Sequence, residues 1–224
     1  MSRFFVGPDN PESWRHGLAK PEHWKQGFSA HSLAYTWHPV DNFPPSVADA
    51  FSASELGFLE LVVGIPEYKV ALPGGDTASQ TDLFALGRTL DGETVAIGVE
   101  GKAREAFGDK TVTDWRAGGS EGKQERLAFL LRILGLDDDD ELSGQRYQLL
   151  HRTASPLIEA VRLNAKHAVM LVHSFGGDNK WFDEFAGFAR LLGAEPKIGT
   201  ISRATRSKRS LYLGWVSDPH PEVS

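Results

Sequence analysis

Two acidic residues and a lysine between positions 82 and 102 form a set that could carry out metal-assisted chemistry. Asp82 stands at the start of the apolar run LFALG, and Glu100 and Lys102 follow the apolar run VAIGV. Carboxylates are hard oxygen ligands, and Mg²⁺ in proteins commonly uses one or two of them together with waters and phosphate oxygens. A lysine beside such an ion can orient a water and offset negative charge in a transition state. The set is therefore suited to hydrolysis of a phosphate ester.

Two neighbouring strands have to position these side chains. Residues 81–89 and 94–105 have β-type sequences and are separated by an Asp-Gly turn, which predicts an antiparallel hairpin. Residues two apart on a strand share a face, so Glu100 and Lys102 should point the same way. Folding back at the turn would bring Asp82 close to Glu100.

The spacing also carries a resemblance to a known superfamily. Asp82, then 17 intervening residues, then Glu100-Gly101-Lys102 resembles the signature of the PD-(D/E)XK nucleases. That resemblance implies hydrolysis of phosphodiester bonds in nucleic acid, with Mg²⁺ or Mn²⁺ as cofactor and DNA as the expected partner. It implies that Asp82, Glu100 and the carbonyl of Gly101 bind the metal, and that Asp82, Glu100 and Lys102 are catalytic, Lys102 by positioning the water. Thr81 stands where that signature usually has proline.

Longer stretches are similar to a family of bacterial proteins of unestablished activity that is assigned the same fold. They include IPEYKVALPGG, SQTDLFALGR, VEGKAREAFG and RYQLLHRTAS. The resemblance spans about residues 46–175 and implies the restriction endonuclease-like αβββαβ core, an α/β fold whose mixed sheet is flanked by helices. We expect an aromatic-rich N-terminal extension over residues 1–44 and a nuclease-like domain over residues 45–224.

Hydrophobic periodicity predicts the remaining elements. A helix is expected where Phe51, Phe58 and Val62 form one stripe, and it should end before Pro66. The PGG turn after residue 72 and the two strands above it predict a three-stranded meander. The expected helices are 46–63, 121–134, 144–165 (with Pro156 kinking or splitting it) and 181–193, and the expected strands are 68–72, 81–89, 94–105, 167–175 and 210–216.

Five further side chains are accessory candidates for the site. Acids from the expected first helix or first strand could reach the metal, and a polar pair one turn apart on the helix after residue 144 could reach a phosphate. For each of them the alternative is an ordinary solvated position on a helix or strand surface. The candidates are Glu55, Glu60, Glu67, Gln148 and Arg152.

A basic stretch near the C-terminus is the one candidate for direct contact with nucleic acid. Residues 202–210 contain Arg203, Arg206, Lys208 and Arg209 and no acid. Phosphate contact and a solvated loop are equally reasonable interpretations. The chain as a whole has a net charge of −6, so binding through bulk charge is not expected.

Composition limits the remaining classes of function. The chain has no cysteine, which excludes disulfides, thiol nucleophiles and thiolate metal sites. No segment has the length of apolar residues that a membrane span needs, and the N-terminus does not read as a secretory signal, so we expect a cytoplasmic protein with no membrane partner. The histidines at 16, 23, 31 and 38 match no compact zinc spacing, so a structural role is favoured for them.

Three hypotheses remain open at this point. The first is a Mg²⁺-dependent nuclease acting on DNA or RNA, which could work as a homodimer. The second is a catalytically inactive binding or assembly module that keeps the fold, as the acidic net charge and the aromatic N-terminal segment would allow. The third is a non-nucleolytic hydrolase that uses the same carboxylates on a smaller phosphoester.

Overall fold

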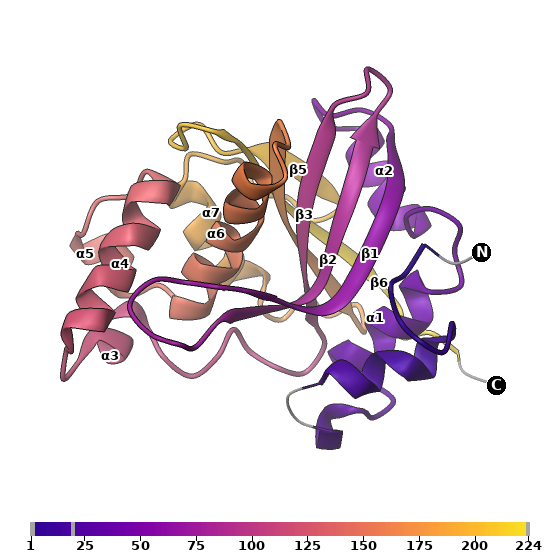
Figure 1. The fold of residues 1–224 in the computed structure, drawn as a ribbon, viewed down its shortest axis with the longest axis horizontal. Coiled ribbons are helices and arrows are strands. Elements are labelled where there is room, and N and C mark those ends of the chain that lie inside the picture. Colours follow the sequence, from indigo (N-terminus) through magenta and orange to yellow (C-terminus); the bar gives the residue numbers. More distant parts are fainter. Residues whose placement is uncertain (1–2, 19–20, 223–224) are drawn as a thin grey trace.

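A single mixed β-sheet forms the centre of the molecule. The computed structural model describes residues 3–18 and 21–222, and within them six strands lie in the order β1-β2-β3-β4-β6-β5 (Figure 1). Antiparallel pairing joins β1 to β2, β2 to β3 and β5 to β6, while β3–β4 and β4–β6 are parallel. The strands are β1 (Leu59–Val70), β2 (Ser79–Thr89), β3 (Thr94–Lys102), β4 (His167–Phe175), β5 (Thr200–Arg203) and β6 (Ser210–Asp218).

Helices cover both faces of this sheet. On one face α6 crosses from β3 to the parallel strand β4, beside α7, and α4 packs outside α6. On the other face lie α1, α2 and the N-terminal segment. The helices are α1 (Ser29–Trp37), α2 (Pro45–Ser52), α3 (Val112–Arg116), α4 (Glu121–Leu134), α5 (Asp140–Ser143), α6 (Tyr147–Arg162) and α7 (Phe182–Leu191), with 3₁₀ turns at Pro11–Gly17 and Pro21–His23.

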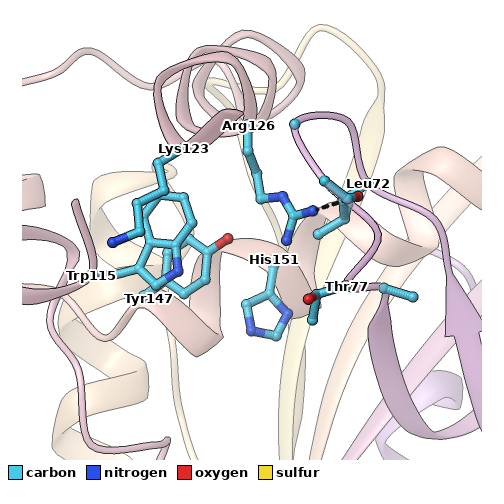
Figure 2. A pocket seen from close by; sticks show the side chains of 10 residues that line it. Leu72, Thr77, Trp115, Lys123, Arg126, Tyr147 and His151 are labelled. Carbon is cyan, nitrogen blue, oxygen red and sulfur yellow. Dashed lines mark hydrogen bonds between the residues drawn. The ribbon is translucent and has the colours of Figure 1, made fainter. Parts of the chain in front are cut away.

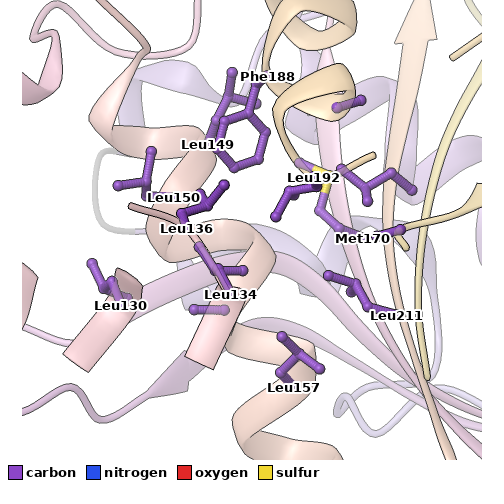
Figure 3. Packing of buried hydrophobic residues seen from close by; sticks show 14 of the residues in the cluster. Leu130, Leu134, Leu136, Leu149, Leu150, Leu157, Met170, Phe188, Leu192 and Leu211 are labelled. Atoms are coloured by element: carbon purple, nitrogen blue, oxygen red, sulfur yellow. The ribbon is translucent and has the colours of Figure 1, made fainter. Parts of the chain in front are cut away.

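Each face of the sheet has its own apolar core, because successive residues of a strand point to opposite sides. On β3, Ala96 packs toward α6, whereas Val95, Ile97 and Val99 pack toward α1 and α2. Leucines of α4 and α6 meet Met170 of β4 in the first core, as Figure 3 shows. The chain is therefore a three-layer α/β/α protein, which confirms the expected mixed sheet flanked by helices.

The N-terminal segment is part of the second core. Trp37 is fully buried, and its indole Nε1 donates to Nδ1 of His173 on β4 at 3.0 Å. Trp14 is also buried and donates to His38 at 3.1 Å. Of the four N-terminal histidines, His31 and His38 thus lie among aromatic rings, while His16 and His23 are exposed.

The helix expected over residues 46–63 is wrong. α2 ends at Ser52, and the chain then turns and enters β1 at Leu59. Gly57, at φ +65°, interrupts any helix here, and Phe58 and Val62 are exposed and form no buried stripe. Pro66 does not end a helix; it lies within β1, which is an edge strand and so tolerates a residue without an N–H group.

The other boundaries agree more closely. The observed α4 and β4 have the expected limits, and α6 is one helix through Pro156, so Pro156 does not split it. The antiparallel meander β1–β2–β3 is confirmed, although β1 is much longer than the expected strand 68–72. β5 was not expected, since its residues were read as the beginning of the basic loop.

Candidate active site

Asp82 and Glu100 lie where the β2–β3 ladder ends. The last paired residues are Leu83 and Val99, and Asp82 and Glu100 come next on their strands. Beyond this point the N–H of Gly101 donates to Oδ2 of Asp82 at 2.8 Å. The two acids predicted from the sequence are therefore neighbours at the opening end of a hairpin.

Glu100 is the centre of a buried network. Its side chain accepts from Nζ of Lys102 at 2.8 Å and from Nε2 of Gln148 at 2.9 Å on Oε1, and from Nε of Arg152 at 2.6 Å on Oε2. Glu100 is 2% exposed and Lys102 4% exposed. Burial by itself would raise the pKa of Glu100, but the positive charges of Arg152 and Lys102 lower it to about 2. Glu100 is therefore a carboxylate at neutral pH.

Lys102 and Glu100 share the sheet face that the alternation predicted. The ammonium group of Lys102 also lies 4.8 Å from the centre of the Phe107 ring, a cation–π distance. Gln148 and Arg152, one turn apart on α6, reach the same carboxylate from above the sheet. These two accessory candidates are thus brought into the site, and their helix-surface interpretation does not hold.

Glu67 is the third acid of the cluster, and its backbone is strained. In the β1–β2 ladder Pro66 pairs with Leu83 and Tyr68 with Thr81, so Glu67 faces Asp82 with no ladder pair between them. Its φ is +53°, a left-handed conformation that costs a non-glycine residue free energy and that occurs preferentially at functional sites. Its carboxyl accepts from Nε2 of Gln80 at 2.6 Å.

Two of the three carboxyls have raised pKa values. Burial, with the negative charge of Glu100 in addition, raises the pKa of Glu67 to about 7. Burial followed by the charges of Glu100 and Glu67 raises the pKa of Asp82 well above its ordinary value. Lys102 and Arg152 oppose this rise for Asp82, and Arg152 and Lys69 oppose it for Glu67, but burial outweighs them. The fold therefore opposes ionisation of Asp82 and Glu67, and a cation bound beside them would favour it.

The chemistry of these donors fits a small divalent cation. Both oxygens of Glu100 accept hydrogen bonds, but Oε2 accepts only one within the described residues, and Oδ1 of Asp82 accepts none there, so lone pairs remain. No group of three or more His, Cys, Asp or Glu side chains in the described part of the chain has a metal-binding arrangement. A Mg²⁺ site needs only one or two carboxylates, because a backbone carbonyl and waters complete it.

Gly101 is fixed by packing on the other face of the sheet. A Cβ atom on this residue would lie 2.5 Å from Cδ1 of Leu33, which belongs to α1. Only glycine lets α1 sit this close to β3. The N-terminal segment thus packs on one face of β3, and Glu100 and Lys102 lie on the opposite face.

A second layer of polar groups holds Arg152. Ser79 Oγ accepts from Arg152 Nη1 at 3.2 Å and from Ser155 Oγ at 2.9 Å. Ser79 Oγ also lies 2.8 Å from Nδ1 of His151, at hydrogen-bond distance. Burial and the charge of Arg152 lower the pKa of His151 to about 3, so the ring is neutral.

Two adjoining cavities lie beside this network. A cavity of about 440 Å³ is lined in part by Gln80, Gln148 and Arg152, so it reaches the partners of Glu67 and Glu100. It shares Tyr147 and His151 with a second cavity of about 280 Å³ between α4, α6 and the β1–β2 loop. Figure 2 shows the second cavity from close by.

Glu55 and Glu60 do not belong to the site. Glu60 pairs with Arg3 and faces Arg88, near the far end of β1 from Glu67. Glu55, in the turn after α2, accepts from the hydroxyl of Tyr212 and lies 3.7 Å from Arg203. Both were candidates only because a helix was expected where a turn and a strand occur.

The basic stretch lies at the opposite end of the sheet from the acidic cluster. Ser210, which ends it, pairs with His167 of β4, whereas Glu100 pairs with Val172 of β4, which in turn pairs with Trp215 of β6. At about 3.3 Å per residue, roughly 17 Å of β6 separates Ser210 from Trp215. Arg203, Arg206, Lys208 and Arg209 therefore do not contact a phosphate bound at Glu100. Arg203 itself belongs to β5 and not to a loop.

Sequence reasoning missed Ser79, Gln80 and His151. A signal was present, because Ser79 and Gln80 directly precede Asp82's strand run and His151 directly precedes Arg152. Their roles depend on how α6 packs against β2, and the sequence does not specify that packing.

Fold and site together define an α/β protein with a charged cluster at the end of a sheet hairpin. The chain belongs to the family described as Domain of unknown function (DUF6946), whose model matches residues 8–220. The match includes most of the N-terminal segment as well as the sheet. Comparison with curated proteins and with solved structures gives no significant match. In the described part of the chain, no helix has both the length and the apolar character needed to cross a bilayer.

Proposed function

We propose that the chain is a metal-dependent nuclease-like hydrolase of phosphodiester bonds, with DNA as the first candidate substrate and Mg²⁺ or Mn²⁺ as the cofactor. The observation that carries this proposal is that the carboxyls of Glu67, Asp82 and Glu100 meet beside Lys102, where the fold opposes ionisation of the first two. Raised carboxyl pKa values and a strained backbone cost folding free energy, and such costs concentrate at functional sites.

The order of elements supports the finer fold assignment. A helix, a three-stranded antiparallel meander, a crossing helix and a strand parallel to the third occur in this order as α2, β1–β2–β3, α6 and β4, with α3, α4 and α5 inserted before α6. That is the order expected for the restriction endonuclease-like core. Asp82 and Glu100-Gly101-Lys102 occupy the second and third strands of the meander.

The residues divide the work as follows. Asp82, Glu100 and the Gly101 carbonyl would hold the ion, which when bound would polarise a phosphoryl oxygen and acidify a water. Lys102 would donate to the attacking water or to the developing negative charge. Arg152 and Gln148 keep Glu100 ionised and oriented, and Arg152 lines the cavity through which a phosphate would approach.

Asp82→Asn is the sharpest test of this proposal. The amide oxygen can still accept from the Gly101 N–H, and the substitution removes a carboxyl whose ionisation the fold opposes, so the variant should fold at least as stably at pH 8. Its metal-dependent cleavage should nevertheless fall by about a hundredfold or more, the usual effect of removing one electrostatic group of a site.

The assay uses plasmid DNA, linear duplex, single strands and RNA, each with Mg²⁺, Mn²⁺ or EDTA. Lys102→Met is the second variant. Asp138→Asn, which removes an exposed ion pair with Arg116, is the matched control and should cleave like the wild type. Equal cleavage by wild-type protein and Asp82→Asn, or no metal-dependent cleavage of any substrate by pure wild-type protein, overturns the proposal.

One observation favours a second candidate, an inactive binding or assembly module. Both Glu100 oxygens are engaged by Lys102, Gln148 and Arg152, an arrangement that could be wholly structural. Calorimetric titration with Mg²⁺ separates the two. Heat of binding that disappears in Asp82→Asn supports the hydrolase, and the absence of any binding to wild-type protein supports the module.

A further inference from the structure

The cavity of about 280 Å³ between α4, α6 and the β1–β2 loop is positively charged. Lys123 and Arg126 line it and no Asp or Glu does, although the chain carries a net charge of −6. In Figure 2, Trp115 and Tyr147 form one side, Leu72 and Thr77 the other, and Arg126 and His151 lie between them.

Arg126 is buried without a counter-ion. It is 7% exposed, and its Nε and Nη2 donate to the carbonyls of Pro73 at 2.8 Å and Gly75 at 3.0 Å. Within the described residues no carboxylate lies at ion-pairing distance from it, and its remaining polar neighbour is the hydroxyl of Tyr147. A buried charge of this kind is costly unless an opposite charge accompanies it. The cavity beside it is where such an anion could bind.

Tyr147 adds a polar group to the same wall. It is 9% exposed, and its buried hydroxyl lies close to the Arg126 guanidinium without a hydrogen bond of normal geometry among the described residues. A buried hydroxyl usually has a well-formed hydrogen bond, which a ligand oxygen in the cavity would supply. The ring is held by stacking on Trp115, at 3.9 Å and 8° between planes.

The cavity is preformed. A Cβ on Gly74 would lie 1.9 Å from the carbonyl oxygen of Gly122, so the β1–β2 loop touches the start of α4 backbone to backbone. Arg126 binds the same loop. The polar groups that line it therefore need little rearrangement on binding: the Arg126 guanidinium, the Tyr147 hydroxyl and the neutral His151 ring.

We infer that this cavity binds a phosphate group of the nucleic-acid substrate, one that neighbours the bond cleaved at Glu100. Several N–H and O–H donors around one space suit an anion with several oxygens. At about 30 Å³ per water, 280 Å³ corresponds to roughly nine waters, enough for a phosphate with part of the nucleotide attached. The adjoining cavity leads past Gln148 and Arg152 to Glu100. The choice of nucleic acid as the ligand rests on the proposed function. The assignment of a phosphate site rests on the cavity alone.

Binding is measured in EDTA, so that the result does not depend on metal or on cleavage. The probes are inorganic phosphate, and a short oligonucleotide with and without a 5′-phosphate, titrated by calorimetry at constant ionic strength. Tyr147→Phe keeps the stacked ring and removes only the hydroxyl, and Lys123→Met removes a cation of the wall. Lys166→Met, at the other end of the sheet, is the matched control.

Tyr147→Phe should weaken binding of inorganic phosphate and of the phosphorylated oligonucleotide about fivefold, and Lys123→Met about tenfold, with the control unchanged. Urea unfolding should show Tyr147→Phe to be as stable as the wild type, which excludes misfolding as the cause. No binding of either phosphate probe, or binding that both substitutions leave unchanged, overturns the inference. Binding of inorganic phosphate without binding of the oligonucleotide overturns its nucleic-acid part.

The outcomes also separate this inference from the proposed function. If both variants lose phosphate binding but the wild-type protein cleaves no substrate, the phosphate site is supported and the proposed hydrolase activity is refuted. If the protein cleaves its substrate with metal, and KM is the same in wild type, Tyr147→Phe and Lys123→Met, the hydrolase activity is supported and the phosphate site is refuted.

Discussion

Replacing Glu67 by glutamine should stabilise the protein at alkaline pH and leave it unchanged at acid pH. The folded state raises the pKa of Glu67 from 4.5 to about 7, chiefly by burial. Between these values the folded protein keeps a proton that the unfolded chain has lost, so stability falls as the pH rises from about 4.5 to about 7 and is constant above. Glutamine cannot ionise, so the variant does not show this fall.

The size of the effect follows from the two pKa values. At about 1.4 kcal/mol per pH unit, the difference corresponds to about 3 kcal/mol at pH 8, which is an upper figure because Glu67 is partly exposed. The left-handed backbone at this position is the same in both proteins, so its strain cancels. The Gln80 bond is kept as well, since an amide oxygen accepts in place of the carboxyl.

The assay is urea unfolding of wild type and Glu67→Gln in EDTA from pH 4.5 to 8.5. Glu60→Gln, which removes an exposed ion pair with Arg3, is the control and should change stability by less than about 1 kcal/mol throughout. A Glu67→Gln protein that is less stable than the wild type at pH 8, or whose advantage is the same at every pH, refutes the reasoning about the cluster.

Three more substitutions test the frame around the cluster by urea unfolding at pH 7. Gly101→Ala should cost about 1–3 kcal/mol, because its Cβ would overlap Leu33; a neutral result would mean that α1 can move. Arg152→Met should lower the free energy of unfolding by about 3–5 kcal/mol, because the buried Glu100 carboxylate loses a cationic partner. Adding Glu100→Gln should recover part of that loss. No recovery would show that Arg152 acts through packing. Trp37→Phe should cost about 1–3 kcal/mol through the lost bond to a buried imidazole, and an unchanged midpoint would contradict that bond.

The sequence predicts the local arrangement of Asp82, Glu100 and Lys102 better than the elements that lead into them. Alternation along β3 places Glu100 and Lys102 on one face, and the Asp-Gly turn sets the hairpin that brings Asp82 to them. These are local rules, and they operate over a few residues. The observed meander and the limits of α4 and β4 follow from the same kind of local pattern.

The failures occur where a local pattern has two interpretations. Phe51, Phe58 and Val62 recur at helical spacing, yet only Phe51 is buried, and the turn at Gly57 separates a short helix from a long edge strand. Glu55 and Glu60 were assigned to the site through that expected helix and lie elsewhere. Tertiary packing decides the secondary structure of such segments, because an apolar stripe stabilises a helix only if another element packs against it.

The network around Glu100 has no local signal at all. Gln148 and Arg152 reach it from a helix 48 and 52 residues further along the chain. Their position depends on how α6 crosses the sheet, which the close approach of Pro156 to Gly98 helps to set: a Cβ on Gly98 would lie 3.2 Å from the proline ring. Contacts of this kind are determined by packing and appear only in the folded structure.

The cluster and the cavity beside it have opposite electrostatic defects. The fold opposes ionisation of Glu67 and Asp82, and Arg126 is a buried cation with no carboxylate at ion-pairing distance within the described residues. Adjoining cavities lie beside the two groups. A substrate that brings an anion to Arg126 and a cation that binds the acids would each remove one defect. Binding one should therefore favour the other, as both act on the same fold through Arg152 and His151.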